Sequence, residues 1–128
     1  MLQKESWTYI CDNTNVKWVK IFQLYKGFNR KHTYIGFFTK GSCRSVEPPR
    51  HEYKGYKYKF LIKGDISKQL LVRASKPIRC SSSKVFKLQT NDSIAIKKKM
   101  EPKSKFLLGP SLRVTKRKRI SSLFAVSI

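Results

Sequence analysis

The sequence predicts an all-β domain, a small barrel or sandwich, and three features of the chain support this prediction. Short segments rich in Tyr, Phe, Trp, Val and Ile recur at intervals of roughly ten residues. Turn-forming Gly, Pro, Asn and Asp residues separate these segments. Within several segments apolar and polar side chains alternate, as they do on a strand with one buried face. The 128 residues suit a single domain, 1–128, with one core.

The N-terminal third of the chain contains three expected strands. Residues 6–10 form a short β-prone segment that ends at the turn-forming sequence CDNTN. The next segment, VKWVKIFQLYKG (16–27), carries apolar side chains on both faces, which favours a central barrel strand. The third segment, TYIGFFTKG (33–41), is expected to bend at Gly36. The aromatic side chains expected in the core are Trp18, Phe22, Phe37 and Phe60.

A projecting basic loop is expected near residues 44–56, because Pro48 and Pro49 interrupt regular structure. It leads into YKGYKYKFLIKGD (53–65), where aromatic or aliphatic residues alternate with lysines and predict a strand with one apolar and one positive face. The side chains expected to close the barrel are Tyr58, Phe60 and Ile62, and those expected to face a polyanion are Lys57, Lys59 and Lys63.

The remaining expected elements follow the KGD turn. The segment ISKQLLVRA (66–74) is a strand candidate, and KVFKLQTNDSIAIK (84–97) is expected to form a hairpin that turns near Thr90. We therefore place the barrel in about residues 1–97. Residues 98–128 are expected to form a basic loop, a short helix that starts at Pro110, and an apolar tail that docks on the body.

The charge of the chain is strongly one-sided, with 29 Lys and Arg residues against 7 Asp and Glu residues and a formal net charge of +22. Such a chain repels itself when it is compact unless an outside polyanion balances the charge. Nucleic acid is the first candidate and an anionic membrane the second. No apolar run approaches the ~20 residues of a spanning helix, and the N-terminus lacks a signal-peptide core. The sequence therefore predicts a nucleic-acid partner and no membrane partner.

The residue patterns of enzymes and metal sites are missing from the sequence. His32 and His51 lie in basic loops, and a ribonuclease that used them as acid and base would need a disulfide framework. The three cysteines, Cys11, Cys43 and Cys80, are widely spaced and odd in number, which favours reduced, partly buried thiols over disulfides. Zinc-ligand pairs such as CxxC and phosphate-binding glycine loops do not occur. We predict no catalysis, no metal and no cofactor.

Positive residues occur in several runs that are spread over the chain, such as KKK at 97–99 and KRKR at 116–119. A single run is usually a solvated face or a localisation signal, but several runs around one small domain favour an embedding in folded nucleic acid. Aromatic residues are interleaved with these charges. Tyr53 and Tyr56 suit base stacking and core packing equally well.

Several short motifs, in order and with matching spacing, resemble the universal large-subunit ribosomal protein fourteen family. They are MLQ at 1–3, DNT at 12–14, KGD at 63–65 with LLVR and Ala74, NDSI at 91–94, LLGP at 107–110 with Arg113, and RISSL at 119–123. The chain departs from the family pattern at Asn15, Ser83, Leu88 and Val114, and its segment between Arg113 and Arg119 is shorter. The resemblance implies a five-stranded β-barrel of OB/SH3-like type, with an extra hairpin and a short helical C-terminal segment.

By this resemblance the protein is a structural constituent of the large ribosomal subunit, without catalysis of its own. It is expected to bind large-subunit rRNA near the intersubunit face and to help form a bridge to small-subunit rRNA. The resemblance also implies neighbouring large-subunit proteins three and nineteen and a ribosome-silencing factor as partners. The alternative is a free OB-type protein that binds RNA or single-stranded nucleic acid.

The cations that we expect to contact RNA fall into two sets. Those expected to bind large-subunit rRNA are Arg30, Lys31, Arg44, Arg50, Lys57, Lys59, Lys63, Arg73, Lys76 and Arg79. Those expected on the intersubunit side are Lys97, Lys98, Lys99, Arg113, Lys116 and Arg117.

The composition also suggests a cellular location. Lys, Ile, Phe, Tyr and Asn, which have AT-rich codons, are plentiful, and the resemblance starts at the first residue. We therefore expect a mitochondrial, organelle-encoded protein, with the bacterial cytoplasm or a plastid as alternatives.

Overall fold

The computed structural model describes residues 2–27, 29–48, 60–79, 83–112, 120 and 124–127 of the chain. The regular structure of these residues consists almost entirely of strands. In chain order they are β1 (Leu2–Gln3), β2 (Trp7–Ile10), β3 (Val16–Leu24), β4 (His32–Thr33), β5 (Phe38–Val46), β6 (Ile66–Arg73), β7 (Ile78–Arg79), β8 (Val85–Phe86), β9 (Asp92–Ile96), β10 (Leu107–Ser111) and β11 (Phe124–Ser127).

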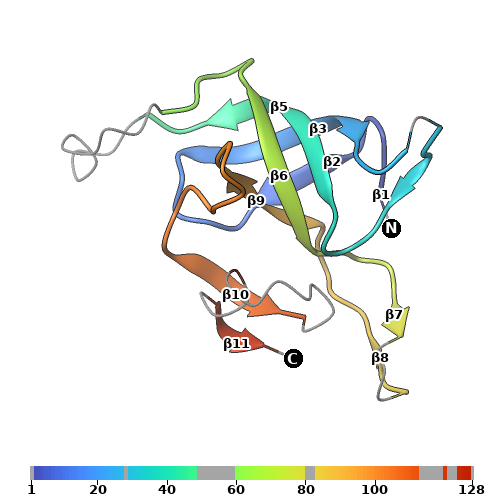
Figure 1. The fold of residues 1–128 in the computed structure, drawn as a ribbon. Helices are drawn as coiled ribbons and strands as arrows, with labels where there is room; N and C mark the ends of the chain where they lie inside the picture. Colours follow the sequence, from blue (N-terminus) through green and yellow to red (C-terminus); the bar gives the residue numbers. More distant parts are fainter. Residues whose placement is uncertain are drawn as a thin grey trace.

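Five strands close into a barrel in the order β2-β3-β5-β6-β9 (Figure 1). All neighbours in this order are antiparallel, and β9 completes the ring by pairing with β2 in parallel. Because the barrel is closed, its sheet has no free edge at which another chain could pair. The predicted all-β class and five-stranded barrel are confirmed.

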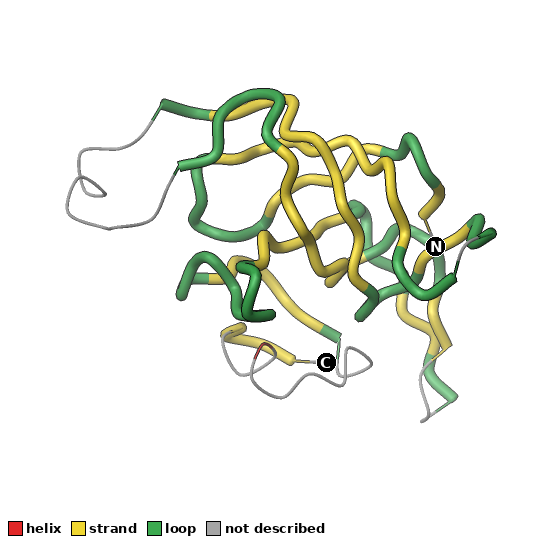
Figure 2. The backbone as a smooth tube through the Cα atoms, turned by 45° about the horizontal axis from the view of Figure 1, so that its top comes forward, coloured by secondary structure: helices red, strands yellow, loops and turns green. Residues whose placement is uncertain are grey.

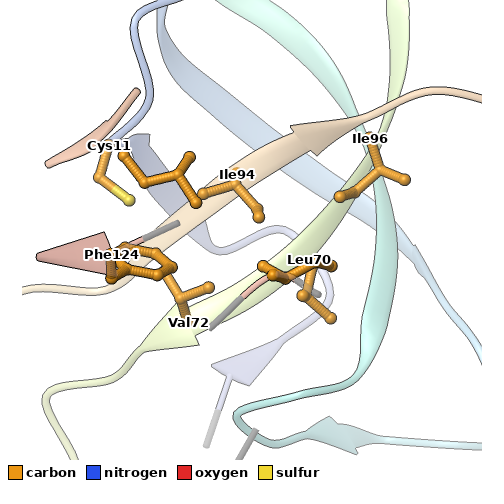
Figure 3. Packing of buried hydrophobic residues seen from close by; sticks show 8 residues of the cluster. Cys11, Leu70, Val72, Ile94, Ile96 and Phe124 are labelled. Carbon is orange, nitrogen blue, oxygen red and sulfur yellow. The ribbon is translucent and has the colours of Figure 1, made fainter. Parts of the chain in front are cut away.

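Three two-stranded sheets surround the barrel (Figures 1 and 2). Strands β1 and β4 pair near the N-terminus, and β7 and β8 form the extra hairpin that the resemblance implied. Strands β10 and β11 pair in parallel beside the barrel. The side chain of Phe124 in β11 packs with Leu70, Val72 and Ile94 of the barrel (Figure 3), so this residue of the C-terminal tail lies against the body.

The barrel interior contains a buried polar network as well as aliphatic side chains. The amide oxygen of Gln69 accepts hydrogen bonds from the hydroxyls of Thr8 (3.3 Å) and Ser93 (3.1 Å). Its amide nitrogen donates to the Ser67 hydroxyl at 3.1 Å. These four side chains come from β2, β6 and β9, so the network joins strands that are far apart in the chain and favours one register.

The face of β3 that lies in the core differs from the prediction. Trp18 and Phe22 were expected inside but are 41% and 39% exposed, and the side chains that point inward are Val16, Val19, Ile21 and Leu24. The reason is that the pairing of β3 with β5 contains register shifts around Trp18 and after Ile21. Each such irregularity interrupts the alternation of faces on which the prediction relied. Phe37 and Phe60 are partly buried.

The prediction of a strand within residues 53–65 is also wrong where the structure describes this segment. Residues 60–62 are not in a strand, and Ile62 is 64% exposed, so it does not close the barrel. Instead the chain turns at Gly64, whose N–H donates to Cys43 O (2.8 Å), and Ile62 N–H donates to the Asp65 carboxylate (3.1 Å). After this turn the chain enters β6, which pairs with β5, while the described residues 60–62 lie outside the strands. Tyr58, Lys57 and Lys59 lie outside the described residues.

Two further expectations near the C-terminus are corrected. Strand β8 pairs with β7 and not with β9, so residues 84–97 do not form a hairpin. At the expected turn, the side-chain oxygen of Asn91 accepts a hydrogen bond from the N–H of Ser75 (2.9 Å). This bond connects the start of β9 to the segment after β6. Pro110 lies in β10 and starts no helix there. Residues 113–119 lie outside the described part of the chain. Gly36, by contrast, forms the predicted bend, with φ +86 between β4 and β5.

Candidate nucleic-acid interface

The predicted RNA-contacting cations that the structure describes are mostly at the surface. The exposed ones are Lys31, Arg44, Lys63, Lys76, Arg79, Lys98 and Lys99. The partly buried ones are Arg30, Arg73 and Lys97. The others, Arg50, Lys57, Lys59, Arg113, Lys116 and Arg117, lie outside the described residues.

Arg30 is held in the loop between β3 and β4 by its own neighbours. Its Nε donates to His32 O at 2.7 Å, and its guanidinium lies 4.7 Å from the centroid of the Phe37 ring. The ammonium of Lys26 lies 4.4 Å from the same centroid. The ring therefore gathers two cations at one loop, and cation–π attraction offsets part of their repulsion. Sequence reasoning missed Lys26, although its position close to the predicted contacts Arg30 and Lys31 was a usable signal.

Arg73 has a structural role in the protein. Its Nε donates to the Asp92 carboxylate, and its Nη1 donates to the carbonyl oxygens of Leu108 (2.7 Å) and Pro110 (3.1 Å). The approach is close because Gly109, at φ +82, has no side chain there: a Cβ would lie 2.3 Å from Arg73 Nη1. Arg73 thus ties β10 to the barrel end of β6. Its side chain is only 11% exposed, so we leave it out of the proposed RNA-facing set.

A cationic cluster that sequence reasoning missed lies on the outer face of β5 and β6. Lys40 and Lys68 stand directly opposite each other in the register of these two strands. The ammonium of Lys68 lies 4.7 Å from the Phe38 ring centroid and 5.1 Å from that of Tyr25, and Lys40 lies 5.9 Å from Tyr25. Like charges directly opposite each other destabilise a sheet. We call Tyr25, Phe38, Lys40 and Lys68 the lysine–aromatic cluster.

The loop after β9 extends this cluster. Met100 touches the Lys68 ammonium through its sulfur, and Met100 N–H donates to Lys97 O at 3.1 Å. Lys97 N–H in turn donates to Glu101 O at 2.7 Å, which closes a tight turn. The turn exposes Lys98 and Lys99. Four lysines from two strands and one loop are thereby brought to one region, although they are up to 59 residues apart in the chain (99 minus 40).

A buried carboxylate positions the far end of this loop. Asp12 accepts from the N–H and hydroxyl of Thr14 and from Ala95 N–H at 2.9 Å, and burial raises its pKa. Lys103, whose N–H donates to Ala95 O, is the nearby cation that acts against this rise. Desolvation lowers the pKa of Lys103. Asp12 thus links the segment after β2, strand β9 and the basic loop in one bonded unit.

The thiols of the two described cysteines are buried. Cys11 and Cys43 are free and buried, as predicted, and burial raises the pKa of Cys11 to about 12. A thiol with that pKa stays protonated at neutral pH and is a poor nucleophile. Over the described ranges, His, Cys, Asp and Glu nowhere gather in a group of three or more that could hold a metal ion. Within the described part of the chain, no helix has the length and apolar character needed to cross a membrane.

The chain matches a known protein family over almost its whole length. The family model described as Ribosomal protein L14p/L23e matches residues 1–127. This family consists of structural proteins of the large ribosomal subunit, with large-subunit rRNA and ribosomal proteins as partners. The match spans every strand from β1 to β11, and the chain therefore belongs to the ribosomal protein L14p/L23e family.

Proposed function

We propose that this protein binds large-subunit rRNA near the intersubunit face and helps form a bridge to small-subunit rRNA. Its barrel acts as a scaffold that presents cations from loops and outer strand faces to phosphate groups. Such contacts position a protein on folded RNA by charge and shape and do not require base readout. The protein has no catalytic step in this proposal.

The lysine–aromatic cluster is the observation that carries this proposal. Lys40 and Lys68 face each other across β5 and β6 in a domain of charge +22, so an anion beside them would reduce their mutual repulsion. Phosphates supply that anion and release counterions as they bind. The nearby Lys98 and Lys99 extend the same positive region.

The remaining assignments rest on the resemblance to the family and, for the described residues that are exposed, also on that exposure. We propose rRNA contacts for Lys31, Arg44, Lys63, Lys76 and Arg79, and also for Arg30, Arg50, Lys57 and Lys59. The proposed intersubunit set is Lys97, Lys98, Lys99, Arg113, Lys116 and Arg117. Large-subunit proteins three and nineteen are proposed as neighbours, a ribosome-silencing factor as a further partner, and the mitochondrion as the compartment.

A salt-wash experiment on assembled subunits tests the rRNA proposal. The wild-type protein should co-sediment with large subunits in ~0.5 M salt, where peripheral electrostatic binders dissociate. The double variant Lys40→Gln/Lys68→Gln should dissociate at clearly lower salt, and the slope of log affinity against log salt should fall by about 1.5 to 2. The matched control is Lys17→Gln/Lys20→Gln, which removes the same charge from lysines that are already paired with Glu47 and Glu5. The control should behave like the wild type.

Two outcomes would contradict the proposal. If Lys40→Gln/Lys68→Gln and wild type dissociated at the same salt, the cluster would not contact phosphates. If the wild-type protein washed off as a free monomer that melts single strands, the free OB-type binder would be the better description. The compartment has its own test, because immunodetection in purified mitochondria against cytosol decides it directly.

A further inference from the structure

A second surface of the barrel differs from the lysine–aromatic cluster in both composition and charge. The outer face of β2 and β3 exposes three aromatic side chains: Trp7 (50%), Trp18 (41%) and Phe22 (39%). In the register of these strands Trp7 lies opposite Lys20 and Tyr9 lies opposite Trp18, with the two rings of the latter pair 5.4 Å apart in an edge-to-face contact. We call Trp7, Tyr9, Trp18 and Phe22 the aromatic face. It carries both tryptophans of the chain.

The aromatic face is ordered by the fold and is not a chance exposure. Strands β2 and β3 are adjacent members of the closed barrel wall (Figure 1). Their inward side chains Thr8, Val19 and Ile21 are fully buried, which fixes the other side chains outward. Contiguous exposed aromatic side chains with a polar rim mark interaction surfaces, because soluble proteins otherwise avoid them.

Two lysines on this face, Lys17 and Lys20, form ion pairs within the protein itself. Lys20 pairs with Glu5 and Lys17 pairs with Glu47, at the two ends of the stretch of β3 that contains Trp18. Lys20, and after it Arg44, lower the pKa of Glu5, so this carboxylate stays ionised. The chain has only 7 acidic residues for 29 basic ones, and two of them are used here. Carboxylates beside lysines weaken attraction for phosphate, so this face suits a partner that is not a polyanion.

We propose that the aromatic face docks an apolar segment of a neighbouring protein of the same particle. This inference rests on the proposed function, which embeds the chain in the ribosomal subunit. The aromatic face has tryptophan and tyrosine side chains at its centre and ion pairs at its rim. Hot spots of protein–protein interfaces have the same arrangement. The lysine–aromatic cluster, with its facing lysines, takes RNA, and the aromatic face takes protein.

Site-specific photocrosslinking in assembled large subunits tests the assignment of both surfaces. A photoreactive p-benzoylphenylalanine replaces Trp18 in one variant and Lys68 in another. The adduct at position 18 should resist ribonuclease and disappear with protease, and its peptide should map to an apolar segment of one protein. An RNA adduct at position 18, or none, would overturn the inference.

The second position keeps this inference separable from the proposed function. The probe at position 68 should give an RNA adduct that ribonuclease removes. If position 68 gave no RNA adduct while position 18 still gave a protein adduct, the rRNA assignment would fail and the docking face would stand. The reverse result would remove the docking face alone.

A substitution experiment supplies an independent readout. In purified subunits that contain Trp7→Ala/Trp18→Ala, quantitative mass spectrometry should show one protein reduced about tenfold or more, as expected when two hot-spot side chains are lost. The matched control is Tyr34→Ala, which changes an aromatic residue that is 49% exposed between β4 and β5 and should leave every protein at its normal level. Normal stoichiometry of all proteins in the tryptophan variant would contradict the inference.

Discussion

At the residue scale, Arg73 shows that a cation of this highly basic chain can stabilise the fold by bonds within the protein. A side chain in a basic stretch invites assignment to RNA, yet Arg73 is bonded to Asp92 and to two carbonyl groups of β10. The side chains of Arg73 and Asp92 are 11% and 4% exposed. Removing one partner of such a pair leaves the other charge buried without compensation.

We therefore expect Arg73→Ala to lower the free energy of unfolding by about 3 kcal/mol. Arg79→Ala, at an exposed position of β7, should change it by less than about 0.5 kcal/mol. Urea unfolding followed by circular dichroism measures both values. Equal effects of the two substitutions would show that the Arg73–Asp92 pair contributes nothing to stability.

Cys11 makes the stability of the folded protein depend on pH. Its pKa is raised from 9.0 to about 12 in the folded protein, chiefly by burial. The folded state therefore keeps its proton where the unfolded chain has lost it, and stability present below pH 9.0 is lost progressively up to pH 12. Cys11→Ala should flatten the decline in stability over this window, as measured by urea unfolding at several pH values. An unchanged slope would mean that other groups dominate it.

At the element scale, the pairing of β3 with β5 decides which face of the barrel is apolar. Gly41 permits this pairing, because a Cβ at that position would lie 2.4 Å from Val19 Cγ1 and 2.8 Å from the Lys20 carbonyl oxygen. The same Cβ would lie 3.1 Å from Gln69 Nε2, so it would also crowd the buried polar network. A close approach of this kind between two strand backbones requires glycine.

We expect Gly41→Ala to destabilise the protein by about 1–3 kcal/mol, since it overpacks the barrel against backbone atoms. The neighbouring substitution Ser42→Ala, at a partly exposed position of the same strand, should have an effect below about 0.5 kcal/mol. Thermal unfolding of the two variants compares them directly. A Gly41→Ala protein as stable as the wild type would imply that β3 and β5 separate at no cost.

Element prediction succeeded where local signals were strong and failed where pairing decided. The turns at Gly36 and Gly64 were readable because their backbone angles require special residues. The segment 56–62 has a period-two pattern, but its described residues 60–62 are not in a strand, and β5 pairs with β6. The exposed position of Trp18 depends on a register shift, which no single strand encodes.

At the scale of the whole molecule, the net charge of +22 must be balanced from outside. We expect the isolated protein to gain thermal stability as salt rises from ~0.05 to ~0.5 M, because screening weakens self-repulsion. A rise in melting temperature of at least about 4 °C corresponds to roughly 1 kcal/mol in a domain of this size. The variant Lys40→Glu/Lys68→Glu, with a charge of +18 (22 minus 4), should gain less. A falling melting temperature would contradict this account.

The sequence by itself determined the β class and the family and predicted a polyanionic partner, because composition, turn residues and ordered motifs are local properties of the chain. It also indicated that the apolar tail returns to the body, since such a segment is costly to leave in water. Only the tertiary structure decided which cations stand together. Lys40 meets Lys68, and Arg73 meets Asp92 and β10, through strand register and barrel closure. The separation of a basic cluster from an aromatic face likewise follows from which side of each strand the closed barrel turns outward.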